Sequence, residues 1–400
     1  MTTDQRATLY PIGASVVADD LVRDPYPIYA RMQSAEPISW VAVLGMYYVV
    51  RYEHVQAILK EPARFSVGTE RSTLFDTFGI HMLTVDDERH ERFRGAFQPY
   101  FSASAIRSAL EMQIRAHVDH LLDGFKARRR AEMRSAFASR LPILTMLSMF
   151  GLPQARETEV RDWYDSFEAA LANFEWNSAV RETARRNVQA FCQMIQNAVD
   201  HYRREPDPHA LLSNLANAPA EARLDDEAIQ HNSLIVLFGG ISTVEALILN
   251  SLSALCAHPE TCRQVRAEPA LIPSVLEETM RWSGPVQSAT RHVVNDTTFA
   301  GVRFKAGEIV NCMIAAANRD PGKFPDPDRF DIARPGLRQH LGFAFGLHHC
   351  LGLHLAKLEA RIALEQFFTQ LPGYRTDPSQ PYELLGSEFR RPPQLTLVWD

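Results

Sequence analysis

The chain has 400 residues, of which 46% are hydrophobic and 10% aromatic, and its formal net charge is -6. That composition supports a large hydrophobic core, and the lack of a long basic run argues against nucleic acid as a partner. The five cysteines are scattered without CxxC pairing, which argues against a disulfide framework, a zinc site or an iron-sulfur cluster.

No linker, low-complexity run or internal repeat divides the sequence, so we expect a single domain over residues 1–400. The N-terminus lacks the apolar core of a signal peptide. We also find no apolar window of the roughly 20 residues that a membrane span needs. These features favour a cytoplasmic protein without a membrane anchor.

The first 83 residues predict a short helix, a hairpin and a second helix. The helix covers about 25–32, the hairpin strands cover 38–44 and 47–50, and the second helix runs from Tyr52 to Leu59. A loop rich in phenylalanine follows and includes Phe75 and Phe78.

The segment 87–94 reads as the start of a helix with acidic residues in its first turn. His90 and Arg94 are spaced i and i+4, so they share one helical face. Two such donors could clamp the anionic groups of a cofactor, although residues of this kind more often form a solvated face.

Residues from about 106 to 204 show helical periodicity, interrupted at Gly151 and by a looser stretch from Asn173 to Asn177. This region says little about chemistry. Its aromatic residues either pack in the core or line a cavity, and the core is the commoner place for each: Trp163, Tyr164, Phe167, Phe174 and Trp176.

The longest helical pattern starts at Asp225 and covers about 30 residues, or roughly 45 Å at 1.5 Å per residue. Its middle contains Gly239 and Gly240, each of which costs about 1 kcal/mol relative to alanine. Thr243 lies on the same face. Either the glycines leave room for a ligand, or they mark a break between two helices; the apolar flanks favour one helix.

Residues 275–282 predict another helix, with Glu278 and Arg281 at i and i+3. An exposed pair at this spacing contributes only about 0.2–0.5 kcal/mol. Residues 287–292 read as a strand in a small sheet with 302–304 and 309–311. Near the C-terminus, 382–389 and 395–399 predict a closing hairpin.

An apolar run from Phe343 enters a glycine-containing loop, presents Cys350 and then changes to helical spacing. Cys350 is therefore expected at a helix N-terminus, where the helix dipole and free N–H groups lower a thiol pKa. A thiolate held this way can ligate haem iron. The alternative is a buried structural cysteine.

The loop resembles the haem-binding loop of the cytochrome P-450 family, which reads Phe, two residues, Gly, three residues, Cys, one residue, Gly. Phe343, Gly346, Cys350 and Gly352 match, and Ala344 stands where glycine is more usual. The resemblance implies haem b. It assigns Cys350 as the iron ligand and these further haem contacts: His90, Arg94, Arg291, His348, Phe343, Gly346 and Gly239.

The segment around Gly240 and Thr243 is similar to the oxygen-binding part of that family's long central helix. Ser242 replaces the usual acid before the threonine. The catalytic residues implied are Thr243, Ser242 and Gly240, and we add Glu245 as a candidate for feeding a water chain. The family's Glu-x-x-Arg network implies a third member, for which the sequence suggests Arg329.

The family also implies a mainly helical, triangular fold with small sheets, and haem between the long central helix and the cysteine helix. The implied reaction inserts one atom of dioxygen into a small to medium apolar substrate, as hydroxylation or O-dealkylation. Electrons from NAD(P)H would arrive through a ferredoxin and its reductase, or through a fused flavin and iron-sulfur reductase. Members of that fused type carry a segment similar to 239–245.

We expect an apolar, aromatic pocket because separate segments supply phenylalanines. Its expected members are Phe75, Phe78, Phe167, Phe174, Ile241, Val286, Ala289 and Phe389. Two other functions stay open. A haem-thiolate sensor or electron carrier needs Cys350 but not the Gly-Gly and threonine groove. A peroxide-driven enzyme is the other, although such relatives usually replace the threonine that is present here.

Overall fold

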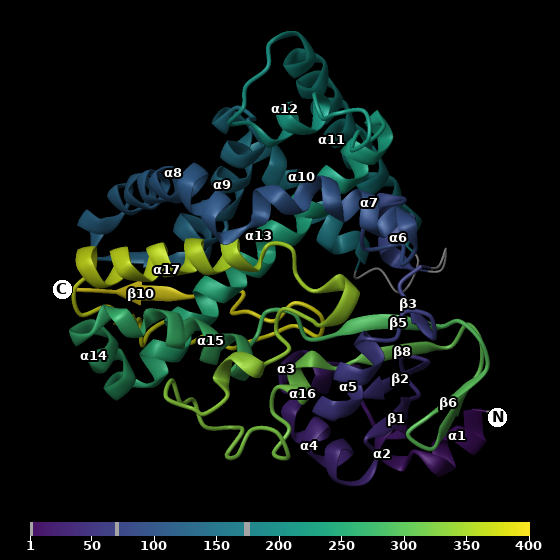
Figure 1. The fold of residues 1–400 in the computed structure, drawn as a ribbon. Helices are drawn as coiled ribbons and strands as arrows, with labels where there is room; N and C mark the ends of the chain where they lie inside the picture. Colours follow the sequence, from purple (N-terminus) through teal and green to yellow (C-terminus); the bar gives the residue numbers. More distant parts are fainter. Residues whose placement is uncertain (1–2, 69–71, 172–176) are drawn as a thin grey trace.

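The computed structural model describes residues 3–68, 72–171 and 177–400. Figure 1 shows a triangular outline, with helices over the top and left and a sheet-containing region at the lower right. The prediction of a mainly helical fold with small sheets is confirmed.

Helices make up most of the fold. They are α1 (Thr3–Leu9), α2 (Pro11–Ala14), α3 (Ala18–Arg23), α4 (Tyr26–Ala35), α5 (Tyr52–Leu59), α6 (Thr73–Phe78), α7 (Glu88–Phe97), α8 (Ala103–Asp123), α9 (Leu141–Phe150), α10 (Glu157–Leu171), α11 (Ser178–Arg204), α12 (Leu211–Ala216), α13 (Asp226–Ala257), α14 (Pro259–Ala267), α15 (Ile272–Trp282), α16 (Ile314–Ala317) and α17 (Leu353–Gln370).

Ten short strands form three sheets in the described ranges. They are β1 (Ile38–Val41), β2 (Met46–Val49), β3 (Phe65–Ser66), β4 (Arg130–Glu132), β5 (Ala289–Val293), β6 (Thr297–Phe299), β7 (Val302–Phe304), β8 (Ile309–Cys312), β9 (Arg375–Thr376) and β10 (Thr396–Val398). The sheet orders are β1-β2-β8-β5-β3, β4-β10-β9 and β6-β7.

The predicted hairpin at β1 and β2 and the helix α5 are confirmed. Two strand pairings were predicted wrongly. β7 pairs with β6 and not with β5, because the chain turns back at once through Gly301. β10 pairs with β4 and β9, while Leu385 pairs with Arg391 in a separate bridge.

Helix α13 runs unbroken for 32 residues, so the prediction of one long helix is confirmed. Asp225 caps its N-terminus by accepting a hydrogen bond from the Ala228 N–H at 2.8 Å. The helix is long and apolar enough to span a membrane, contrary to our reading of the sequence. However, 78% of its most apolar window is buried inside the protein, which is typical of a central core helix.

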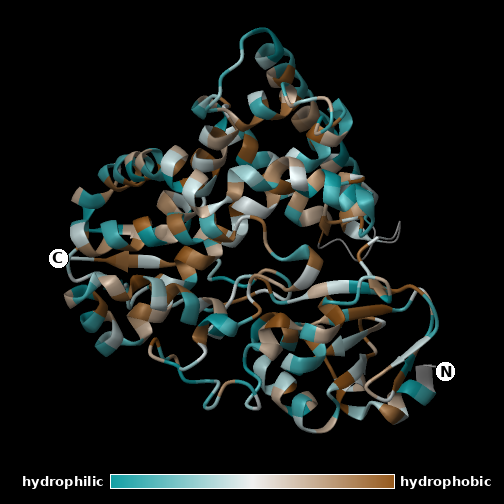
Figure 2. Ribbon diagram, viewed as in Figure 1, coloured by the Kyte–Doolittle hydropathy of each residue, from teal (hydrophilic) through white to brown (hydrophobic). Residues whose placement is uncertain are grey.

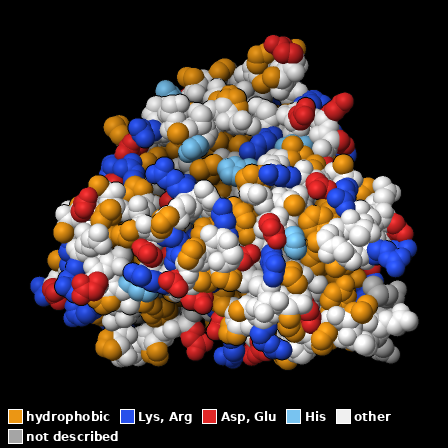
Figure 3. All heavy atoms as spheres, turned by 60° about the horizontal axis from the view of Figure 1, so that its bottom comes forward, with side chains coloured by type: hydrophobic (Ala, Val, Ile, Leu, Met, Phe, Trp, Pro, Cys, Tyr) orange, Lys and Arg blue, Asp and Glu red, His pale blue; other side chains and the backbone are white. Residues whose placement is uncertain are grey.

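The main hydrophobic core surrounds α13 and includes the inner faces of α8, α9, α10 and α17. Figure 2 shows the hydrophobic colour on β10 and on the inner parts of the central helices, with hydrophilic residues on the outer turns. On the face drawn in Figure 3, Lys and Arg side chains lie among Asp and Glu side chains. The core thus holds α13 and α17 against each other, which positions the site described next.

Candidate active site

The Cys350 loop lies directly before α17 and is closed by its own backbone. The Cys350 N–H donates to the Phe343 carbonyl at 2.9 Å. Gly346 has a φ of 76°, and a Cβ there would clash with the Leu59 carbonyl oxygen. Only glycine adopts this φ without strain and leaves space for the Leu59 carbonyl. The absence of a side chain at Gly346 therefore lets the loop pack directly on the end of α5.

Ala344 also adopts a left-handed backbone, with a φ of 58°. This conformation costs a residue with a Cβ roughly 1–2 kcal/mol. The departure from the usual glycine therefore adds strain to the loop.

Burial raises the pKa of the Cys350 thiol in the polypeptide, against our expectation of a lowered value. The backbone N–H groups of Gly352 and Leu353 and the charges of Arg94 and Lys357 oppose this rise. The N-terminus of α17 thus lowers the thiol pKa, as expected, but the loss of hydration raises this pKa by more.

One face of α13 is accessible although most of the helix is buried. Gly239 is exposed, and Val236, Gly240 and Thr243 are half-buried. A Cβ on Gly239 would have no neighbouring atom within 4 Å. The Thr243 hydroxyl donates to the Gly239 carbonyl at 2.6 Å. We call Val236, Gly239, Gly240 and Thr243 the accessible stripe.

Three cationic or donor side chains, His90, Arg94 and Arg291, gather near Cys350, and none of them forms an ion pair with a carboxylate in the described part of the chain. Both ring nitrogens of buried His90 lack a hydrogen-bond partner. Arg291 is buried, and its guanidinium donates a hydrogen bond to the Thr290 carbonyl at 2.9 Å. Burial lowers the pKa of both Arg291 and Arg94, and the nearby Cys350 opposes this shift at Arg94.

His348 joins this group from the cysteine loop. Its ring meets that of His90 edge to face with centroids 4.7 Å apart, and its Nε2 lies 2.7 Å from Asp86 Oδ1. His348 Nδ1 has no partner. Sequence reasoning missed Asp86, because an aspartate in a loop gives no signal of a histidine partner 262 residues away.

These observations fit a bound haem. Buried donors without partners are costly, and they suit the two carboxylates of a haem. Arg291, Arg94 and His90 would hold those carboxylates, and Cys350 would hold the iron. The accessible stripe leaves space on α13 for small ligands.

Two of the other sequence candidates on α13 face away from the stripe. Ser242 is 1% exposed and lies beside Tyr164; burial raises the pKa of Tyr164, and Ser242 opposes this rise. Glu245 lies 2.6 Å from Arg134 Nε and 3.0 Å from Arg391 Nε. Burial raises the pKa of Glu245, and the two arginines oppose the rise.

The charge network on α15 has a different third member from the one predicted. Glu278 and Arg281 are buried and share two hydrogen bonds of 2.7 Å. Arg334, which is 7% exposed, lies 3.5 Å from Glu278. The exposed Arg329 contributes only its backbone carbonyl, to both Arg281 and Arg334. The choice of Arg329 was wrong because the loop turns its side chain outward.

The expected pocket residues divide into two groups. Phe78, Phe167 and Ile241 are buried, and the first two are in ring contact at 5.4 Å. Phe75, Val286, Ala289 and Phe389 are half-buried. Phe174 lies outside the described residues.

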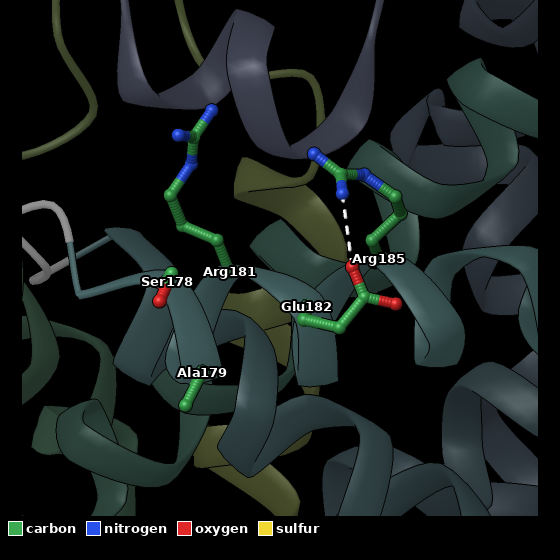
Figure 4. Close-up of a pocket in the computed structure, with 5 residues that line it drawn as sticks. All are labelled: Ser178, Ala179, Arg181, Glu182 and Arg185. Atoms are coloured by element: carbon green, nitrogen blue, oxygen red, sulfur yellow. Dashed lines mark hydrogen bonds and ion pairs between the residues drawn. The ribbon is translucent and has the colours of Figure 1, made fainter.

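A surface cavity of about 410 Å³ lies at the start of α11. Figure 4 shows Glu182 paired with Arg185, while Arg181 extends in another direction. Arg181 pairs with Asp76 of α6 at 2.6 Å. These ion pairs tie α11 to itself and to α6.

The chain is similar to known proteins of a single family. The family model for cytochrome P450 matches residues 32–372. The chain is 32% identical over 398 residues to the cytochrome P450 monooxygenase PikC of Streptomyces venezuelae, covering 96% of this chain and 92% of that protein. It is 31% identical over 379 residues to the biotin biosynthesis cytochrome P450 of Bacillus subtilis, covering 90% and 93%.

The fold is similar to that of P450BioI, solved in complex with an acyl carrier protein that bears hexadec-9Z-enoic acid. The TM-score is 0.87 at 28% identity, over 96% of this chain and 100% of that one.

Proposed function

The chain belongs to the cytochrome P450 family of haem monooxygenases, and we propose that it inserts one oxygen atom into a small to medium apolar substrate. Substituted aromatics are the favoured class, with hydroxylation or O-dealkylation as the outcome. The observation that carries this proposal is the combination of the Cys350 loop with the accessible stripe on α13. An electron carrier would need the first feature and not the second.

Haem, when bound, supplies the redox chemistry by which dioxygen is activated. The residues of this chain hold it and control what reaches it. Cys350 contributes the thiolate ligand, while Arg291, Arg94 and His90 orient the haem carboxylates. Gly239 leaves open space on this face of α13 for a ligand, whereas Gly240 makes room for the Met146 side chain.

Thr243 is the proposed proton donor at the oxygen-binding face. Its Oγ1 donates to the Gly239 carbonyl and keeps lone pairs that can accept a hydrogen bond from water. The hydroxyl donates to a ligand once it turns away from that carbonyl. A hydroxyl held this way passes protons on without carrying a charge.

The substrate preference rests on the half-buried residues among the expected pocket members, which include Phe389 and Val286. Phe389 forms a backbone bridge to Val286, and its ring centroid lies 6.2 Å from that of Phe238 on α13. The loop from Gly386 to Phe389 thereby reaches the helix that carries Thr243. A flat aromatic substrate would be held by such rings.

The electron donor is proposed to be a separate ferredoxin with its reductase, or a fused flavin and iron-sulfur reductase, both ultimately using NAD(P)H. The protein is proposed to act in the cytoplasm, as suits the chain's scattered free thiols.

The test combines a spectral screen with turnover. Substituted aromatics that shift the haem absorption band are incubated with NAD(P)H and a surrogate ferredoxin and reductase, and products are identified by mass. We expect oxygenated product that depends on NAD(P)H. Absence of product across the panel, with peroxide-driven product present, would replace the proposal by a peroxygenase.

Phe389→Ala and Phe75→Ala test the pocket within the same assay. We expect weaker binding and a changed regioselectivity for each. Leu9→Ala, at a surface residue that is 59% exposed, is the control. If both phenylalanine variants behave like the control, these rings do not contact substrate.

A further inference from the structure

A polar cluster lies between α10 and α13, on the side of α13 away from the accessible stripe. Its position is set by Tyr164, whose ring stacks on Phe238 with centroids 5.1 Å apart and planes inclined by 15°. Phe238, Ser242 and Glu245 follow one another at i, i+4 and i+7, so they share a helical face. The hydroxyl end of Tyr164 consequently lies over Ser242.

The Tyr164 hydroxyl lies between Glu168 and Ser242. It donates to Glu168 Oε1 at 3.4 Å, one turn further along α10. On the other side it faces Ser242, whose Oγ is buried and completes no hydrogen bond in the structure. A rotation of the serine hydroxyl about its own side-chain bond would complete the chain of three oxygens.

Two carboxylates and two guanidinium groups surround this chain. Arg391 binds both oxygens of Glu168 at 3.2 and 3.0 Å, and its Nε lies 3.0 Å from Glu245. Arg134 binds Glu245 from the other side. The Glu168 side chain is 21% exposed, whereas Glu245 is 4% exposed. Glu168 is therefore the member through which the cluster exchanges protons with solvent.

Among Phe238, Ser242 and Glu245, which share the face of α13 toward α10, Ser242 lies nearest to the accessible stripe. It precedes Thr243 in the chain, and Gly239 stands one turn earlier with open space where a side chain would be. A water beside Gly239 would therefore connect the Ser242 hydroxyl to that of Thr243.

We infer that Tyr164 is a proton-relay residue, which passes protons from Glu168 through Ser242 to Thr243 and so supplies the acid that the α13 sequence lacks before its threonine. This inference rests on the proposed function. The acid of this relay is Glu168, which lies on α10 four residues after Tyr164, and not on α13.

The relay conserves atoms and charge. In the structure the Tyr164 hydroxyl donates to Glu168, so it first turns toward Ser242. A Glu168 carboxyl that has taken up a proton from solvent then donates it to the Tyr164 oxygen, while the tyrosine proton moves to Ser242 Oγ and the serine proton moves to the water beside Gly239. That water gives one of its own protons to Thr243 Oγ1, and the Thr243 proton goes on to the ligand at the accessible stripe. Tyr164 and Ser242 each gain one proton and lose one. Glu168 is left as a carboxylate on Arg391 and takes up a new proton from solvent. Burial raises the pKa of Tyr164 well above its usual value, so it stays a neutral phenol throughout.

The first arm of the test involves no turnover. Infrared difference spectra of the resting ferric protein are recorded during pH jumps for the parent, Glu168→Gln and Tyr164→Phe. We expect a carboxyl band that disappears in Glu168→Gln and shifts in Tyr164→Phe, because the phenol is its hydrogen-bond partner. A band unchanged in both variants would overturn the inference.

The second arm measures coupling, with 7-ethoxycoumarin as the probe alkyl aryl ether. We expect Tyr164→Phe to give a roughly tenfold lower ratio of product to NAD(P)H consumed, with more hydrogen peroxide. Added hydrogen peroxide brings its own protons, so peroxide-driven product formation should stay near that of the parent. Loss of both reactions would show a structural role and overturn the inference.

Tyr202→Phe is the matched control, since it removes a largely buried phenol hydroxyl that donates to the Gly151 carbonyl. Ser242→Ala should resemble Tyr164→Phe, and the double variant should be no worse than either single one. If the parent converts no compound with NAD(P)H, the proposed function fails while the infrared arm still decides the relay. If Tyr164→Phe couples as well as the parent, the relay alone fails.

Discussion

Glu278 and Arg281 face each other across one turn of α15 with two hydrogen bonds of 2.7 Å, and neither side chain is exposed to solvent. The Glu278 carboxylate also accepts the Asp331 N–H at 2.7 Å. Helix α15 is thereby joined to the irregular segment that leads to the cysteine loop. The spacing of this pair alone would indicate an exposed ion pair that contributes little to stability. Because the pair is buried, removing either partner would leave an unpaired charge in the core and destabilise the protein.

Arg334→Ala is expected to destabilise the protein by about 3 kcal/mol, because it leaves part of a buried carboxylate without its partner. The free energy of unfolding from urea titration measures the effect. Arg329→Ala is the matched control and should stay within about 0.5 kcal/mol, as an exposed side chain does. Equal effects for the two arginines would contradict the network described here.

Ala344→Gly is expected to stabilise the protein by about 0.5–1 kcal/mol, because glycine adopts the left-handed backbone at this position without strain. Thermal or urea unfolding measures the change. Ala116→Gly, at an exposed position inside α8, should have the opposite sign and cost about 1 kcal/mol. A destabilising Ala344→Gly would show that the loop carries no such strain.

Glu359→Gln tests a buried carboxyl that the proposed chemistry does not use. Burial raises the pKa of Glu359 to about 8, and both of its oxygens lack a hydrogen-bond partner. Between the unfolded and folded pKa values, the unfolded chain has lost this proton and the folded one retains it. Stability therefore falls as pH rises through this window, by at most about 1.4 kcal/mol per pH unit.

The glutamine variant keeps a neutral side chain, so its stability relative to the parent should grow between about pH 5 and pH 8 and level off outside that range. Urea titrations of both proteins at several pH values give the difference. A difference independent of pH would show that Glu359 is ionised in the folded protein.

Cys350→His is expected to abolish the thiolate character of the ferrous carbonyl spectrum, because the ligand becomes an imidazole nitrogen. Haem content, measured separately, controls for loss of the cofactor. Cys312→Ser, at another buried cysteine, should leave the spectrum unchanged. An unaltered spectrum in Cys350→His would remove the assignment of the iron ligand.

Thr243→Ala is expected to keep substrate binding but to divert reducing equivalents into hydrogen peroxide, since the hydroxyl at the accessible stripe is lost. Ser242→Ala should have a smaller effect. The measurement is the ratio of product to NAD(P)H consumed, with Ser108→Ala on the surface of α8 as the control. A Thr243→Ala enzyme as well coupled as the parent would show that protons arrive by another route.

The sequence by itself determined the features that depend on neighbours in the chain. The glycine loop before Cys350, the unbroken α13 and the common face of Gly239 and Thr243 all follow from local spacing, because helix periodicity decides which residues share a face. The hairpin of β1 and β2 was likewise readable, since only a short turn separates its strands.

Only the tertiary structure decided which distant groups meet. Arg334 replaced Arg329 because the backbone of an irregular loop determines which side chain points inward. The pairing of β10 with β4 joins residues more than 260 positions apart, and no local pattern specifies that choice. Ser242 and Tyr164 lie on two helices whose periodicity is visible in the sequence, yet their meeting depends on how α10 packs across α13. Packing of whole faces sets that geometry, and it is invisible in the spacing of either helix alone.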